Sequence, residues 1–269
     1  MAGNQLAHLP NKRLGQHFLR DTAILSHIIE ISELSDSDRV LEIGAGDGTL
    51  TRALLETGAL VTAVEIDRKI LPKLRSLAKI EPRLSLIEGD AMKIDHFDLP
   101  TPMKVISNLP YQIASGIIAN LCTRPDWFPL MVLMVQREVG MRLSAGPGGK
   151  DYGTLSLWAG HRYTIEIKRI VPPGAFSPPP KVESALILME ARPSPRVEVP
   201  DEEIYFSLIR AAFAMRRKTI LNNLRSWMHP GGGRIDWLQV LETAGIETRR
   251  RAETLGAEEF AQIARLIPS

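Results

Sequence analysis

The first half of the chain alternates between short apolar runs and amphipathic stretches. The apolar runs predict buried strands over residues 39–43, 60–67, 83–90, 103–107 and 129–136. The stretches between them carry apolar residues at helical spacing and predict helices over 49–58, 68–80 and 112–121. Strands that alternate with helices are typical of a parallel sheet with helices packed against it. We therefore expect an α/β fold of the Rossmann-like, doubly wound kind.

In the second half of the chain the pattern changes from strands to a polar linker and then to helices. Two further strands are predicted over 163–170 and 181–190, and the Pro-rich loop 171–180 between them indicates a hairpin-like pair that closes the sheet. The polar, Pro-rich stretch 190–203 is typical of a linker. The pattern beyond it is helical, over 202–228, 235–246 and 257–267. We expect an α/β domain over 1–196 and a small all-helical domain over 197–269.

Length and composition indicate a globular protein of a reducing cytoplasm. Its 269 residues are 44% hydrophobic with a mean hydropathy of −0.04, which is enough to bury a large core. Neither a run of about eighteen apolar residues nor a secretory or organellar leader pattern is present, so we expect no membrane span and a cytoplasmic location. The single cysteine, Cys122, excludes an intramolecular disulfide. The six histidines lack ligand spacing, so no metal site is expected.

Charge is distributed unevenly although the net charge is only +2. The stretch from Leu208 to Arg234 has no acidic residue and carries Arg210, Arg216, Arg217, Lys218, Arg225 and Arg234. A second basic cluster follows at 249–251. Solvated helix faces normally mix both signs of charge, so this one-signed stretch indicates a polyanionic partner.

A Gly-rich turn follows the first predicted strand, with Gly44, Gly46 and Gly48 in the segment EIGAGDGTLT. Glycines at such a turn let the backbone approach a ligand closely and point helix N-terminal amides at it. A dinucleotide fingerprint would have glycine where Thr49 stands. The G-x-G-x-G spacing after Glu42 instead resembles the first motif of S-adenosylmethionine-dependent methyltransferases. Tight packing alone is the alternative explanation for such a turn.

Two carboxylates follow at the ends of the next two strands. Glu65 ends the second strand, where a carboxylate can accept hydrogen bonds from both hydroxyls of a ribose. Asp90 ends the third, where it can accept from an adenine amine. A single acidic residue at a strand end is commonly a solvated loop residue. Because carboxyl ends of parallel strands share one edge of the sheet, the glycine turn and both carboxylates together predict a cofactor site there.

The fourth strand ends in the motif Asn-Leu-Pro-Tyr, residues 108–111. The lone pair of an exocyclic adenine amine is delocalised into the ring, which makes the amine a poor nucleophile. The Asn108 side-chain oxygen and the carbonyl region of Pro110 could accept its hydrogens and free that lone pair, while Tyr111 could stack on the base. A plain turn is the alternative, because Asn and Pro both favour turns.

With these motifs the chain resembles the small-subunit ribosomal RNA adenine N6,N6-dimethyltransferases, also called dimethyladenosine transferases. The segments that carry the resemblance span most of the chain: 14–21, 40–51, 63–67, 88–92, 108–115, 176–184, 210–224 and 250–267. His17 stands where this family often has Asn. The resemblance implies S-adenosyl-L-methionine as the cofactor.

The same resemblance assigns the site residues. The cofactor contacts that it implies are His17, Leu19, Gly44, Glu65, Ile66, Asp90, Ala91 and Asn108. His17 and Leu19 would line the methionine end of the cofactor, and Ile66 would pack on its adenine. The residues that would hold the target base and act in catalysis are Asn108, Leu109, Pro110, Tyr111 and Phe176. A plain core aromatic is the alternative for Phe176.

The resemblance also implies the RNA partner. Arg216, Arg217, Lys218 and Arg225 would bind phosphates. The target would be two adjacent adenosines in the loop of the 3′-terminal hairpin of small-subunit (16S) rRNA, within a 30S precursor particle, where loop bases can be extruded. We expect the protein to act as a monomer. A solvated helix is the alternative for the basic residues.

Two rival functions share part of this pattern. A large-subunit rRNA adenine N6-methyltransferase of the macrolide-resistance type would share the cofactor motifs and residues 108–111, but the segments FSPPPKVES and FAMRRKTILNNL favour the small-subunit enzyme. A non-catalytic RNA- or DNA-binding factor on the same scaffold is the second rival. The intact set of motifs counts against it, although a checkpoint role in ribosome assembly could coexist with catalysis.

Overall fold

The computed structural model describes residues 16–96, 98–228 and 234–267, and it divides the chain into two compact units. Unit 1 comprises Met1–Gly140 and Ile165–Ala191, and unit 2 comprises Met141–Thr164 and Arg192–Ser269. The second unit thus takes in 141–164, which the sequence pattern placed in the α/β domain. Leu14 and Gly15, the first two residues of the N-terminal motif, lie outside the described residues.

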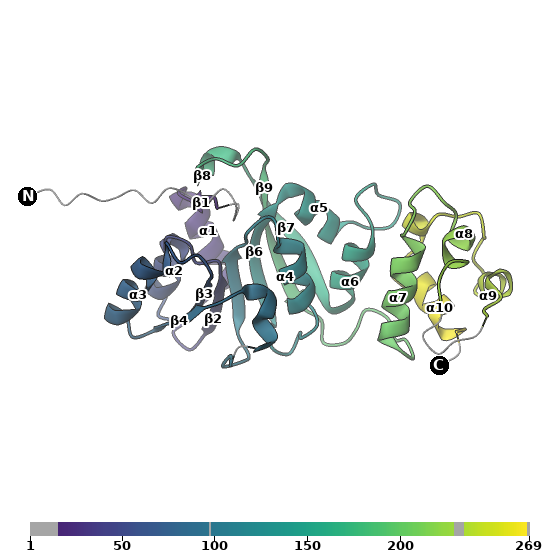
Figure 1. The fold of residues 1–269 in the computed structure, drawn as a ribbon, viewed down its shortest axis with the longest axis horizontal. Coiled ribbons are helices and arrows are strands. Elements are labelled where there is room, and N and C mark those ends of the chain that lie inside the picture. The colour runs from purple at the N-terminus through teal and green to yellow at the C-terminus, as the bar shows by residue number, and fades with distance from the viewer. Residues whose placement is uncertain (1–15, 97, 229–233, 268–269) are drawn as a thin grey trace, which may run out of the picture. The chain divides into compact units, whose positions relative to one another are not determined.

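Unit 1 is built on a seven-stranded sheet with the order β4-β3-β2-β5-β6-β9-β7 (Figure 1). The strands are β2 (Arg39–Ile43), β3 (Leu60–Glu65), β4 (Leu84–Glu88), β5 (Lys104–Asn108), β6 (Leu130–Gln136), β7 (Tyr163–Val171) and β9 (Ser184–Ala191). Strands β2 to β6 pair in parallel, and β9 runs antiparallel to β6. The predicted closing pair is present, because β9 lies between β6 and β7. Strand β6 is buried throughout its middle, as its continuous apolar run predicts.

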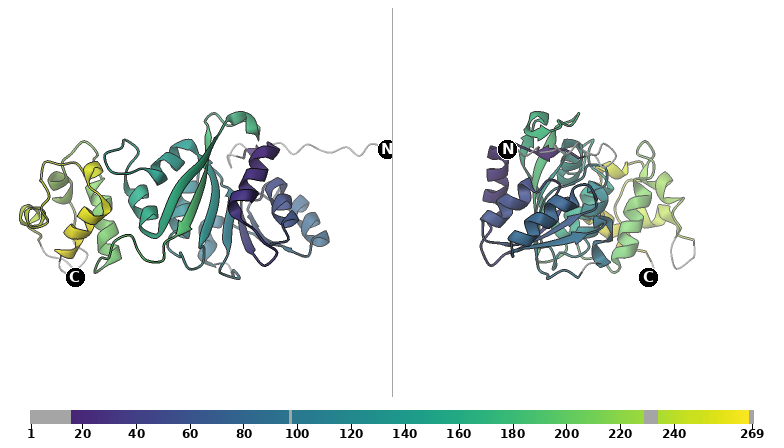
Figure 2. Two further views of the ribbon diagram at one scale, coloured as in Figure 1. Left: turned by 180° about the vertical axis from the view of Figure 1, so that it is seen from behind. Right: turned by 60° about the vertical axis from the view of Figure 1, so that its left-hand side comes forward.

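Helices cover both faces of this sheet. Helix α4 lies in front of the sheet in Figure 1, whereas α1 comes forward when the molecule is seen from behind in Figure 2. The helices of this part are α1 (Thr22–Ser32), α2 (Thr49–Glu56), α3 (Leu71–Ile80), the short η2 (Ala91–His96) and α4 (Ala114–Leu121), while α5 (Arg137–Ser144) begins in unit 1 and ends in unit 2. The pattern predicted α2, α3 and α4 but did not single out α1, whose first turn is capped by the Asp21 carboxylate.

A second, two-stranded sheet joins the N-terminal segment to the Pro-rich loop. Strand β1 (Phe18–Leu19) pairs antiparallel with β8 (Phe176–Ser177), which follows the short helix η3 (Pro173–Ala175). The Ala175 carbonyl accepts hydrogen bonds from the backbone amides of Arg20 and Asp21. These contacts fix the N-terminal segment against a loop that lies far away in the sequence.

Unit 2 is helical and has a core of its own. It contains α6 (Thr154–Arg162), α7 (Glu202–Ala212), α8 (Ile220–Leu224), α9 (Trp237–Thr243), η4 (Ala252–Thr254) and α10 (Ala257–Arg265), packed around fully buried residues such as Tyr205 and Phe260. The predicted helix over 202–228 is broken. Asn223 donates from its side chain to the carbonyls of Ala212 and Met215, which satisfies groups left free where α7 ends.

No helix among the described residues is both long and apolar enough to cross a membrane. Over the same residues, no group of three or more His, Cys, Asp or Glu side chains is arranged to hold a metal ion.

Candidate active site

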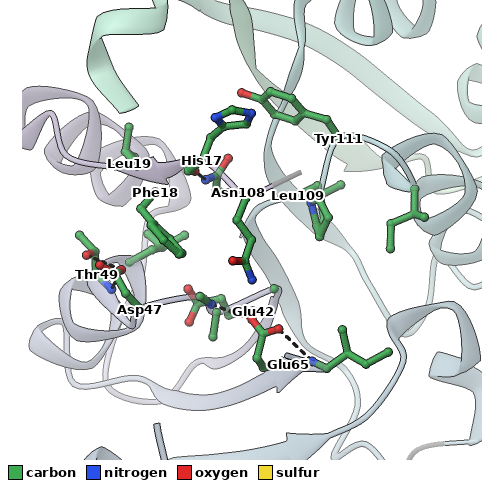
Figure 3. Close-up of a pocket in the computed structure, with 18 of the residues that line it drawn as sticks. His17, Phe18, Leu19, Glu42, Asp47, Thr49, Glu65, Asn108, Leu109 and Tyr111 are labelled. Atoms are coloured by element: carbon green, nitrogen blue, oxygen red, sulfur yellow. Dashed lines mark hydrogen bonds between the residues drawn. The ribbon is translucent and has the colours of Figure 1, made fainter. Parts of the chain in front are cut away.

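A pocket opens at the carboxyl ends of β2, β3 and β5, where the strand order reverses (Figure 3). The chain passes from β2 outward to β3 and β4 and then returns to place β5 on the other side of β2. Ligands of open α/β sheets bind at such a switch point. The pocket brings together most of the predicted site residues: His17, Leu19, Gly44, Glu65, Ile66, Asn108, Leu109, Pro110 and Tyr111.

The Gly-rich turn forms one wall of the pocket with a backbone that only glycine adopts readily. Gly44 and Gly46 have φ of +74° and +55°. A Cβ at Gly46 would lie 2.9 Å from the Phe18 ring, and one at Gly44 would lie 3.2 Å from the Pro110 ring. Side chains at either position would therefore fill the space in which the N-terminal segment and the Asn-Leu-Pro-Tyr loop meet the turn.

Glu65 holds the turn from the end of β3. Its buried carboxylate accepts the Gly46 amide at 2.9 Å through one oxygen, and the amides of Ile66 and Asp67 at 2.9 and 2.8 Å through the other. Each carboxylate oxygen has two lone pairs, so the oxygen that accepts only the Gly46 amide can still accept a further donor such as a ribose hydroxyl. Fixing the carboxylate in advance lowers the ordering cost of binding a sugar.

Glu42 places a second carboxyl group beneath the pocket. It is 2% exposed, and among the described residues its Oε2 atom has no hydrogen-bond partner. Burial is the main reason that the pKa of the Glu42 carboxyl is raised to about 8; the Thr51 hydroxyl opposes this shift, and the charges of Glu65 and Asp47 add to it. The Thr51 hydroxyl is likewise buried and has no hydrogen-bond partner among the described residues. The carboxyl is therefore largely protonated at neutral pH and can donate a hydrogen bond.

The orientation of the Asn108 amide follows from its partner. Its Nδ2 donates to the backbone carbonyl of His17 at 2.9 Å. A carbonyl can only accept, so this bond assigns the nitrogen and leaves Oδ1 as the other atom. Oδ1 is buried and without a hydrogen-bond partner among the described residues, and the residue lines the pocket. A buried acceptor without a partner is costly, which indicates that a ligand donor completes it.

Tyr111 belongs to the same motif as Asn108. Two contacts fix its side chain, one at the hydroxyl and one at a face of the ring. Its hydroxyl lies 2.5 Å from the Ser184 hydroxyl, and its ring stacks on the imidazole of His17 with centroids 5.6 Å apart. Burial raises the pKa of the Tyr111 phenol, and the hydrogen bond to Ser184 partly offsets this. The group therefore stays a neutral phenol at physiological pH.

The N-terminal segment lies over the pocket and contributes residues that the sequence pattern did not single out. Gln16 donates to the Asp67 carboxylate at 2.9 Å on one side of the segment. Arg20 pairs with Asp47 at 2.6 Å and donates to the Thr49 hydroxyl at 3.0 Å on the other. Gln16, Phe18, Asp47 and Ile113 also line the pocket. Only the position of Asp47 inside the Gly-rich turn could have suggested a role from sequence.

Three predicted site residues do not line this pocket. Asp90 follows β4, one strand beyond Glu65, and accepts the Met92 amide through its side chain, while Ala91 is buried at the start of η2. The Gly89 amide donates to the Glu65 carbonyl, which ties the end of β4 to the end of β3. Asp90 therefore lies one strand away from the pocket residue Glu65. Phe176 is 4% exposed and belongs to the hydrophobic core, where it pairs with Leu19. Its predicted clamp on the base stays a prediction.

The basic residues of unit 2 gather where two loops meet. The Ile220 amide donates to the Arg250 carbonyl at 2.7 Å, which joins the basic turn 216–218 to the second cluster, 249–251. Arg216 donates to the Lys150 carbonyl and pairs with Glu253 at 3.1 Å. Arg217, Lys218 and Arg225 are exposed. The turn thus presents several positively charged side chains on the surface of this unit.

The comparisons with known proteins decide the family. The model of the ribosomal RNA adenine dimethylase family matches residues 7–268. The chain belongs to this family. A relative from Syntrophotalea carbinolica, named ribosomal RNA small subunit methyltransferase A, is 45% identical over 97% of each chain. One of the same name from Clostridium acetobutylicum is 39% identical over 94% of this chain and 92% of its own length.

Two solved structures share this architecture. A dimethyladenosine transferase from Plasmodium falciparum covers 92% of this chain and 96% of its own, with a TM-score of 0.76 and 25% identity. The 23S rRNA methyltransferase ErmE has a TM-score of 0.69, covers 91% of this chain and 97% of its own, and at 24% identity is similar in fold. The predictions of a Rossmann-like methyltransferase fold with a helical part, and of an rRNA adenine methyltransferase, are confirmed.

Proposed function

We propose that the pocket binds S-adenosyl-L-methionine and that the protein dimethylates the N6 amines of two adjacent adenosines in the 3′-terminal hairpin loop of small-subunit rRNA. We propose further that it acts as a monomer, in the cytoplasm, on a 30S precursor particle. The relatives named for the small subunit support this substrate over the large-subunit alternative, because they match nearly the whole chain at 39–45% identity.

The residues of the pocket fit this cofactor. The glycine turn offers a close backbone approach, and Glu65 offers a fixed, buried carboxylate to ribose hydroxyls. Ile66 is 52% exposed at the pocket, an apolar surface suited to an adenine face. When bound, the cofactor supplies a methyl group on a sulfonium sulfur, which an amine nitrogen can attack.

The observation that carries the proposal is the buried Oδ1 of Asn108, which has no hydrogen-bond partner in the described part of the chain. An amine hydrogen held on this acceptor draws electron density toward the nitrogen and favours its lone pair for attack. Tyr111 lines the same pocket and offers an aromatic surface on which an extruded adenine can stack. After the first transfer the amine keeps one hydrogen, so the same acceptor can serve the second.

The basic turn 216–218, together with 225 and 249–251, supports an RNA partner. Arg217, Lys218, Arg225, Arg249 and Arg251 of this set are exposed, and exposed basic side chains bind phosphates and position an RNA without reading its sequence.

The test is to incubate the protein with labelled cofactor and either unmodified 30S particles or 50S particles, and to map the modified nucleotides by mass spectrometry. We expect two adjacent dimethyladenosines in the small-subunit rRNA and no label in the large subunit. Label confined to 23S rRNA would support the large-subunit alternative. A product that stops at monomethyladenosine would contradict the dimethylation.

A further inference from the structure

Ser184 contacts the site from outside the pocket. It is fully buried at the first position of β9, and its hydroxyl lies 2.5 Å from the Tyr111 hydroxyl. Ser184 does not line the pocket, whereas Tyr111 does, so the hydroxyl contact links Ser184 to the pocket through the Tyr111 side chain. Each hydroxyl is both a donor and an acceptor, so the pair satisfies two buried polar groups at once.

The backbone around Ser184 is held on two sides. Ser184 is opposite Gln136 in the antiparallel ladder of β6 and β9. Arg137, the first residue of α5 and the next after Gln136, donates its amide to the Glu183 carbonyl at 2.9 Å and pairs its guanidinium with the Glu183 carboxylate at 2.9 Å. Because the ladder and this double contact fix the backbone, the Ser184 hydroxyl is a stationary anchor for the phenol.

The same loop holds the ring that backs Tyr111. The Pro178 carbonyl lies 2.8 Å from His17 Nδ1, and since a carbonyl only accepts, Nδ1 must donate. The imidazole so fixed stacks on Tyr111 at 5.6 Å with an interplanar angle of 29°. A base inserted between two rings needs about 7 Å, twice the ~3.4 Å stacking step of nucleic acids. The His17 side of the ring is therefore closed to a base.

We propose that Ser184 is a positioning residue for methyl transfer. Its hydroxyl holds the Tyr111 ring in its stacked position against His17, so that the opposite face of the ring receives the target adenine beside Asn108 Oδ1. The inference rests on the proposed function, which makes Tyr111 the stacking surface for the base. Removing the Ser184 hydroxyl leaves the half-buried phenol without this partner and frees the ring to rotate.

Kinetics test the proposal with a double-mutant cycle. Ser184→Ala and Tyr111→Phe delete the same hydrogen bond from its two ends, and Phe keeps the ring. We expect each to lower the single-turnover rate about three- to tenfold at saturating cofactor, which corresponds to the loss of one hydrogen bond. The double variant should be no slower than either single variant. Calorimetry should give an unchanged affinity for S-adenosylmethionine in all three.

A matched control separates this role from the loss of any buried hydroxyl. Ser32 is also fully buried in unit 1 and donates to the Ile28 carbonyl at 2.6 Å within α1. Ser32→Ala should leave the transfer rate unchanged. Rates of Ser184→Ala equal to those of the unchanged protein, or losses that simply add in the double variant, would overturn the proposal.

A spectroscopic readout keeps the outcome independent of the reaction. The chain has four tyrosines, so ring-¹³C labelling gives few signals, and Tyr111→Phe identifies the one that belongs to Tyr111. In Ser184→Ala this signal should shift, and it should stay in place in Ser32→Ala. A Tyr111 signal that does not shift in Ser184→Ala would contradict the positioning role, even if methyl transfer proceeds. Conversely, a shifted signal in a protein that modifies no rRNA would retain the Ser184–Tyr111 linkage and reject the proposed function.

Discussion

Asn108 donates its side-chain amide to the His17 carbonyl at 2.9 Å, and this bond assigns Oδ1 as the amide atom that has no partner among the described residues. A strand end and an N-terminal segment 91 residues earlier together orient one acceptor. The chemistry of the site thus depends on a backbone group that carries no sequence signature of its own.

Replacing Asn108 tests that relationship. Asn108→Asp cannot donate to the His17 carbonyl, and Asn108→Ala offers no acceptor, so we expect both to lower methyl transfer at least ~100-fold, as the loss of a preorganised polar group does. Mass spectrometry of the rRNA fragment after reaction measures the loss.

Asn120→Ala is the matched control, because Asn120 also donates its amide to a backbone carbonyl, that of Met92, without lining the pocket. It should keep its activity. Abundant dimethyladenosine from a folded Asn108→Ala protein would contradict the role of this amide in activating the amine.

Glu65 should matter for the cofactor more than its neighbour in the sheet. Glu65→Ala removes the acceptor for ribose hydroxyls and releases the Gly46 amide, so S-adenosylmethionine binding should weaken by about 1–3 kcal/mol in calorimetry. Glu88 lies opposite Glu65 in the register of β3 and β4 but is exposed and paired with Arg75. Glu88→Ala should bind the cofactor normally, and equal affinities in the two variants would remove Glu65 from the site.

Glu42 gives the stability a defined dependence on pH. Its folded-state pKa of about 8 lies above the ordinary value of 4.5, so between these two values the folded protein keeps a proton that the unfolded chain has lost. The contribution of Glu42 to stability therefore falls as pH rises from about 4.5 to about 8. Glu42→Gln cannot ionise and should escape this loss.

Urea unfolding of the unchanged protein and Glu42→Gln measures the effect. The free energy of unfolding of Glu42→Gln minus that of the unchanged protein should increase from pH 5 to pH 8, by up to a few kcal/mol. A difference that is the same at both pH values would show that the carboxyl titrates normally.

The residues of the basic turn should contribute unequally to RNA binding. The Arg216 guanidinium is held by Glu253 and the Lys150 carbonyl, whereas Arg217 is exposed and, within the described part of the chain, has no recorded side-chain partner. Arg217→Ala should therefore reduce the slope of log affinity for the rRNA against log salt by about one, and Arg216→Ala by less.

Arg265→Ala serves as the control, since it removes the same charge from an exposed arginine that is paired with Glu258. Filter binding at several salt concentrations measures all three slopes. Equal slopes for Arg217→Ala and Arg265→Ala would mean that Arg217 is merely solvated.

Local sequence determined the main sheet and the residues at its edge. Strands of five or more residues and helices of two or three turns carry enough apolar periodicity to be read locally, and the glycine turn, Glu65 and Asn108 follow from their places at strand ends. Family resemblance added the methyl donor and the rRNA substrate. The apolar run of β6 and the closing pair β9–β7 were also recognisable from pattern alone.

Tertiary structure alone decided how these residues face one another. Strands β1 and β8 have two residues each, too few for a period, and their pairing joins positions more than 150 residues apart. That pairing buries Phe176 in the core, and the loop that follows brings Pro178 and Ser184 to His17 and Tyr111. The break after α7 likewise depends on Asn223 reaching back to Ala212. Contacts between distant segments leave no local pattern, because the physical cause of each is a partner elsewhere in the chain.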